Sequence, residues 1–93
     1  MTQDKKIQNL ACALTGLKDE KEIQSFLFDL CTPQELDSMA ERWEIAQLLN
    51  EETLSYREIS AQTGASTATI TRVGRFLKQE RHHGYKTALK RAA

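Results

Sequence analysis

The chain has 93 residues, 40% hydrophobic and 28% charged, with four Gly and one Pro. These values are typical of a single folded domain over residues 1–93 and exclude collagen-like and disordered chains. No apolar run approaches the roughly 20 residues of a membrane span, and the N-terminus lacks the apolar core of a signal peptide. We therefore expect a cytoplasmic protein that makes no membrane contact. Because a chain this short buries a small share of its surface, a homodimer is also expected.

The formal net charge is zero, but the charges are unevenly distributed. Residues 72–93 contain seven basic residues and one acid, Glu80, a net charge of +6, and residues 1–71 carry −6. This asymmetry indicates that the C-terminal segment meets a polyanion. A solvated basic tail without a partner is the alternative.

Two amphipathic helices are predicted at the N-terminus, over residues 5–17 and 19–30, because their apolar residues recur three and four positions apart. Gly16 marks the expected end of the first, and Asp19 and Glu20 are expected in the first turn of the second, where the helix dipole favours acids. Cys12 and Cys31 lie in apolar stretches without metal-ligand spacing, which predicts two reduced, partly buried thiols.

The next helix is predicted from its capping residues. Thr32 and Glu35 can form a reciprocal capping box, with Pro33 in the first helical position. The helix should run to about Asn50, and its apolar residues occupy more than one face, which predicts burial from two sides. Residues 1–50 are accordingly interpreted as dimerisation helices.

A helix-turn-helix is predicted over residues 56–78. Ser55 with Glu58 forms a second capping box, and Ser66 is a third cap, so two helices should span residues 56–63 and 67–78 around a turn at Gly64. Ile70 and Val73 are expected to lie on the inward face of the second helix. One more helical piece or a frayed end should follow Gly84. Since no segment alternates at period two, the predicted class is all-α.

The outward face of the second helix is the candidate DNA-binding surface. Thr67, Ala68 and Thr71 at its N-terminal end are suited to base edges in a major groove, and Arg72 and Arg75 to phosphates. The full set of predicted DNA-binding residues is Arg57, Ser66, Thr67, Ala68, Thr71, Arg72, Arg75 and Lys78. Two such helices related by a dyad reach successive major grooves about 34–36 Å apart, so a homodimer also fits double-stranded DNA as the partner.

The segments 40–45 (Ala-Glu-Arg-Trp-Glu-Ile), 64–65 (Gly-Ala) and 68–72 (Ala-Thr-Ile-Thr-Arg) resemble the Trp repressor family. The resemblance extends over about residues 26–78 and is closest to the branch called YerC/YecD-type. It implies a TrpR-like helical bundle that forms an intertwined homodimer and represses transcription on pseudo-palindromic DNA. It also implies base contacts at the positions of Arg57, Thr67, Ala68 and Thr71.

The same resemblance implies an amino-acid corepressor pocket. In the family, the corepressor carboxylate meets the position of Arg72, its ring the position of Arg42, and its amino group is capped near Thr32 of the neighbouring subunit. Val73 and Phe76 stand where the Trp repressor has glycine and serine. Forcing a ligand into a site filled by these larger side chains costs on the order of 1–3 kcal/mol. We therefore expect the family pocket to be occluded and free tryptophan not to bind there, and any small-molecule effector is unknown.

The expected function is sequence-specific transcriptional regulation, as a repressor, by a DNA-binding homodimer. One alternative is a helical adaptor that binds a protein partner and keeps the helix-turn-helix as a scaffold. Another is a DNA-binding protein without sequence preference. An enzyme is not expected, because His82 and His83 are adjacent and nothing supplies a metal-ligand set or a nucleophile with its base. No cofactor is expected.

Overall fold

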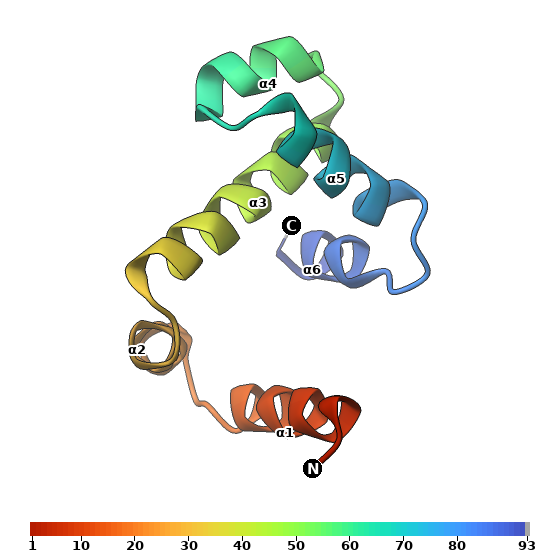
Figure 1. Ribbon diagram of the computed structural model, residues 1–93. Coiled ribbons are helices and arrows are strands. Elements are labelled where there is room, and N and C mark those ends of the chain that lie inside the picture. Colours follow the sequence, from red (N-terminus) through yellow and green to blue (C-terminus); the bar gives the residue numbers. More distant parts are fainter. Residues whose placement is uncertain (93) are drawn as a thin grey trace. The chain divides into compact units, whose positions relative to one another are not determined.

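The computed structural model describes residues 1–92 and contains six helices in that range (Figure 1). They are α1 (Gln3–Thr15), α2 (Glu20–Leu30), α3 (Pro33–Glu51), α4 (Tyr56–Thr63), α5 (Thr67–Lys78) and α6 (Gly84–Ala92). The described residues contain no strand, so the predicted all-α class is confirmed. None of these helices has the length and apolar composition needed to cross a membrane.

The chain divides into two compact units. The N-terminal unit is Met1–Leu36, and the C-terminal unit begins at Asp37. The boundary lies within the first turns of α3. Within the single domain predicted over residues 1–93, residues 1–50 were assigned to dimerisation and residues 56–78 to the helix-turn-helix. Most of α3 therefore belongs to the same unit as residues 56–78.

In the N-terminal unit, both predicted helices are present within two residues of the expected ends. The Thr2 hydroxyl accepts a hydrogen bond from the amide of Lys5 at 3.2 Å, which starts α1 earlier than the apolar pattern indicated. Gly16 caps the end of α1 as expected, in a right-handed conformation with φ −78°.

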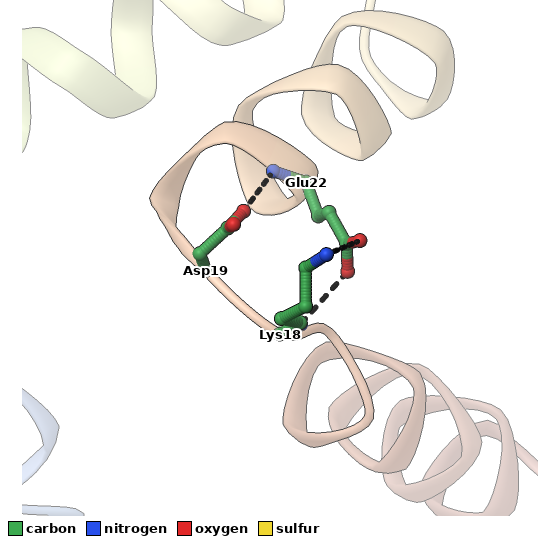
Figure 2. Close-up of polar contacts among 3 residues, drawn as sticks. All are labelled: Lys18, Asp19 and Glu22. Atoms are coloured by element: carbon green, nitrogen blue, oxygen red, sulfur yellow. Dashed lines mark hydrogen bonds and ion pairs between the residues drawn. The ribbon is translucent and has the colours of Figure 1, made fainter.

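The start of α2 differs from the prediction by one residue (Figure 2). Asp19 is the N-cap and not part of the first turn, because its carboxylate accepts a hydrogen bond from the amide of Glu22 at 3.0 Å. The Glu22 carboxylate in turn accepts a hydrogen bond from the amide of Lys18 at 2.8 Å and lies 3.7 Å from the Lys18 ammonium. This reciprocal arrangement between residues 18, 19 and 22 sets the first turn of α2.

The N-terminal unit has no buried side chain in α1 or α2. Ile7, which belongs to the apolar face predicted for the first helix, is 57% exposed. Phe28, which lies in the second helix beside its predicted apolar face, is 63% exposed. Cys12 is exposed and Cys31 half-buried, so the prediction of two partly buried thiols holds for Cys31 and is wrong for Cys12 in the single chain. The apolar faces of these helices find no core within this unit.

The predicted capping box at the start of α3 is confirmed. The Thr32 amide donates to Oε1 of Glu35 at 2.8 Å, and the Glu35 amide donates to the Thr32 hydroxyl at 3.1 Å. Buried residues occur only in the second half of the helix: Ile45, Ala46 and Leu49. The expected burial of α3 from two sides is therefore not found along its first half, where Met39 is 41% exposed.

The core lies in the C-terminal unit. It consists of eight buried hydrophobic residues from α3, α4, α5 and the α4–α5 turn: Ile45, Ala46, Leu49, Ile59, Ala65, Ile70, Val73 and Leu77. Tyr85 and Leu89 of α6 pack against this core. The chain after Gly84, for which either a helix or a frayed end was expected, is a helix through Ala92, and α5 contacts both α4 and α6.

Candidate nucleic-acid interface

The capping box at Ser55 begins α4 at the predicted residue. The Ser55 amide donates to Oε1 of Glu58 at 2.9 Å, and the Glu58 amide donates to the Ser55 hydroxyl at 3.1 Å. The hydrogen bond from the Ser55 amide, and then that with its side chain, hold the pKa of the Glu58 carboxyl below its ordinary value. The ionised form of the Glu58 carboxyl therefore stabilises the first turn of α4.

The turn between α4 and α5 is held by side-chain hydroxyls as well as by its glycine. Gly64 has φ +80°, a left-handed conformation that glycine adopts without steric cost, and its amide donates to the Ser60 carbonyl at 2.9 Å. The Ser60 hydroxyl donates to the Ala65 carbonyl at 2.7 Å. The Thr63 hydroxyl donates to the Ile59 carbonyl at 2.8 Å and accepts from the Ala65 amide at 3.1 Å. These bonds fix how α5 leaves α4.

The orientation of α5 about its own axis follows from its buried residues. Ile70 is 0% and Val73 1% exposed, as predicted. Thr67, Ala68 and Thr71 consequently lie on the opposite face, and all three are exposed. The three residues expected to face a duplex are thus not covered by the chain's own fold.

Ser66 has a structural role at the start of α5. Its hydroxyl accepts a hydrogen bond from the Thr69 amide at 3.1 Å and lies 3.0 Å from the Thr69 hydroxyl. Ser66 is exposed beside Thr67, but its side-chain oxygen is already used as the cap.

The predicted basic contacts fall into two groups. Arg57 and Lys78 are exposed, at the first turn of α4 and the last turn of α5. Arg75 is also exposed but is paired with a carboxylate of the same chain, because its Nε and Nη2 lie 3.0 and 2.9 Å from Oε1 of Glu80. The guanidinium of Arg72 lies over the ring of Phe76, 4.5 Å from the centroid.

Four of the five residues assigned to the family pocket come together around one hollow. Arg42, Arg72, Val73 and Phe76 line a space of about 300 Å³. Val73 is almost fully buried in the core, whereas Phe76 is half-buried and forms part of the wall. The two larger side chains therefore line this space rather than fill it, and that tryptophan does not bind there stays a prediction. The fifth residue, Thr32, is in the N-terminal unit and caps α3.

Sequence reasoning missed part of this wall. His82, Gly84 and Tyr85, from the connection to α6 and its first turn, also line the hollow. The ring of His82 stacks on Phe76 with 6.5 Å between centroids and 10° between planes. None of His82, Gly84 and Tyr85 gave a periodic signal in the sequence. No group of His, Cys, Asp and Glu in the described residues is arranged to hold a metal ion.

The helices and the turn define the class of protein: an all-helical protein in which two short helices, α4 and α5, follow one another across a tight turn, the connectivity expected of a helix-turn-helix. The model of the Trp repressor protein family matches residues 5–93, so the chain belongs to the Trp repressor family, a family of regulators and not of enzymes.

Relatives with names and a solved structure agree with this membership. The chain is 42% identical to the "Uncharacterized protein YerC" of Bacillus subtilis over 94% of this chain and 82% of that protein. It is 41% identical to the "Trp operon repressor homolog" of Actinobacillus succinogenes over 69% of this chain and 62% of that protein. A crystal structure of a TrpR-like protein from Eubacterium eligens superposes with a TM-score of 0.84 at 39% identity, covering 95% of this chain and 89% of that one.

Proposed function

We propose that this protein is a sequence-specific DNA-binding transcriptional repressor that acts as a homodimer and reads the major groove with α5. The observation that carries the proposal is the exposure of Thr67, Ala68 and Thr71 at the N-terminal end of a helix whose other face is buried. Short hydroxyl and methyl groups at this end of a recognition helix are suited to base edges. The similarity to a protein named a Trp operon repressor homolog supports the repressor role.

The basic residues around this face supply the sequence-independent part of binding. Arg57 and Lys78 are exposed near the two ends of the α4–α5 unit, and residues 72–93 carry a net charge of +6. Contacts from such residues to phosphates position a helix and make affinity fall with salt. The acidic residues within residues 1–71 repel phosphates, so they disfavour contact between the duplex and the helices that carry them.

Two arguments support the homodimer in this proposal. One recognition helix buries too little surface for specific binding, whereas a dyad places two helices in successive grooves. The N-terminal unit also leaves Ile7, Phe28 and Leu30 57%, 63% and 49% exposed, a surface that a partner subunit can cover. Residues 1–50 therefore remain our candidate dimerisation segment.

The lining of the hollow bears on whether free tryptophan regulates DNA binding. Phe76 already places an aromatic ring against the Arg72 guanidinium on the wall of the hollow, at 4.5 Å. In the Trp repressor family it is the corepressor carboxylate that meets the position of Arg72, and here that carboxylate has to approach a guanidinium whose one face Phe76 already covers. We therefore propose that L-tryptophan leaves DNA affinity unchanged.

Selection of bound duplexes from a random pool, followed by gel shift with and without L-tryptophan, tests the proposal. Thr71→Ala is expected to weaken the selected site by about 1–3 kcal/mol and to leave random DNA nearly unchanged. Lys78→Ala is expected to weaken both duplexes alike. Thr53→Ala, at an exposed threonine between α3 and α4, is the matched control.

Three outcomes contradict the proposal or part of it. Absence of duplex binding at low salt favours the protein-binding adaptor instead. Equal affinity for selected and random DNA favours a binder without sequence preference. A micromolar tryptophan affinity by calorimetry, with a matching change in DNA affinity, removes the statement on regulation.

A further inference from the structure

The only acidic residue of the segment 72–93, Glu80, is paired with an arginine of α5. Oε1 of Glu80 accepts from Nε of Arg75 at 3.0 Å and lies 2.9 Å from Nη2. The two side chains are 33% and 60% exposed, so the pair is at the surface and open to solvent. One carboxylate oxygen thus engages two nitrogens of a guanidinium that the sequence assigns to phosphate contact.

The backbone after α5 brings the two residues together. The Arg75 carbonyl accepts hydrogen bonds from the amides of Gln79 and Glu80 at 2.8 and 3.1 Å. The chain therefore turns back on the last turn of α5, which places the Glu80 carboxylate next to the guanidinium of Arg75. Arg75 is also held on a second side, since its guanidinium lies 5.3 Å from the centroid of the Phe76 ring.

A guanidinium bound in this way is less available to a phosphate than a free one. Two of its three nitrogens, Nε and Nη2, are engaged by the carboxylate, so a phosphate that uses this edge of the guanidinium must first replace the ion pair, whereas Nη1 keeps its N–H groups. An exposed pair is weak, so the block is partial and reversible. The base-facing residues Thr67, Ala68 and Thr71 take no part in it.

We propose that Glu80 is an autoinhibitory residue that withholds Arg75 from the DNA backbone and so lowers affinity for every duplex. This inference rests on the proposed DNA-binding function and adds one intramolecular competitor to it. Because phosphate contacts do not read sequence, Glu80 changes selected and random duplexes by the same factor. It therefore sets how tightly the protein holds DNA in general and leaves the preferred sequence unchanged.

The test is a double-mutant cycle on the full chain, read as duplex affinity against salt concentration. Glu80→Gln is expected to raise affinity for selected and random duplexes about two- to five-fold, the range of an exposed ion pair. The slope of log affinity against log salt should become steeper by about 0.9 per added phosphate contact. Glu44→Gln, at an exposed carboxylate on α3, controls for the change in net charge.

Arg75→Ala separates release of the arginine from loss of a negative charge. In the wild-type background it should change affinity little, and in the Glu80→Gln background it should cancel the whole gain. An equal effect of Glu80→Gln with and without Arg75, or no effect beyond that of Glu44→Gln, overturns the inference and leaves the proposed function intact. If neither wild type nor Glu80→Gln binds duplex at low salt, the proposed function itself fails.

Discussion

The two units differ in what their amphipathic helices bury. Among residues 1–92, all eight buried hydrophobic side chains belong to the C-terminal unit, where α3, α4, α5 and the α4–α5 turn supply each other's core, and α1 and α2 bury none. Both units show apolar residues at helical spacing. The contrast teaches that this spacing predicts a helix and its apolar face, but not whether that face is covered by the same chain or by another.

The largest expected effect comes from removing one apolar side chain from each unit. Ile70→Ala, at a site with 0% exposure, should lower the free energy of unfolding by about 2–5 kcal/mol, independently of protein concentration. Phe28→Ala, at a site 63% exposed in the single chain, should weaken dimerisation by about 1–3 kcal/mol. Urea unfolding and analytical ultracentrifugation over a range of concentrations measure the two effects.

The contrast between the units holds if the effect of Phe28→Ala depends on protein concentration and that of Ile70→Ala does not. Gln24→Ala, at another exposed position of α2, is the control for Phe28→Ala and should have little effect. If Phe28→Ala changes neither the dimer affinity nor the unfolding midpoint, a second copy does not cover Phe28.

A smaller effect is expected from glycines, one in each unit. A Cβ at Gly74 on α5 would lie 2.6 Å from the hydroxyl of Tyr56, whereas a Cβ at Gly16 would meet only ordinary contacts of 3.5 Å or more. Alanine in a helix interior is favoured over glycine by about 0.8–1 kcal/mol. Gly74→Ala should gain little of this alone and most of it in the Tyr56→Phe background, as measured by thermal unfolding.

Gly16→Ala should need no second change to be neutral or slightly stabilising. Equal gains for Gly74→Ala with and without the Tyr56 hydroxyl would show that α4 and α5 yield to a methyl group at no cost, and would weaken the contrast in packing between the units.

The smallest expected effect is a dependence on pH through α4 of the C-terminal unit. The folded state lowers the pKa of Glu58 from 4.5, so its stabilising contribution is present above that value and is lost as pH falls through the lowered one. Wild type should therefore lose more stability than Glu58→Gln between about pH 7 and about pH 3. Urea unfolding at several pH values measures the difference.

Ser55→Ala with Glu58 retained serves as the control, because it removes the Ser55 hydroxyl, the second cause of the lowered pKa, and keeps the Ser55 amide, the first. Its loss of stability on acidification should lie between those of wild type and Glu58→Gln. The same loss of stability on acidification in wild type and Glu58→Gln would remove Glu58 from the acid response.

Local chemistry explains which parts of the fold were predictable from the sequence. The bounds of α4 and α5 agree to the residue, because Ser55 with Glu58, Gly64 and Ser66 act on the backbone within three or four positions. The exposure of Thr71 followed in turn from the periodicity that buries Ile70. The capping box at Thr32 was predictable for the same reason.

Features that depend on non-helical turns or on another element were not predictable. The contacts of Glu80 with Arg75 and of His82 with Phe76 join residues five and six positions apart across the end of α5, where no repeat applies. Packing of Tyr85 on the core depends on the path of the chain into α6. Cys12, expected to be partly buried, is exposed because α1 finds no cover within its unit.

The hydrogen bonds of the Ser60 and Thr63 hydroxyls limit how far α5 can change its angle to α4. Ser60 and Thr63 tie the turn to the end of α4 by three hydrogen bonds of 2.7–3.1 Å, so the angle of α5 is set before any encounter. When the angle of a helix is fixed, any change of shape needed for a close fit has to come from the ligand. For a duplex this means bending or changing groove width, so flexible base steps outside the contacted bases would contribute to preference.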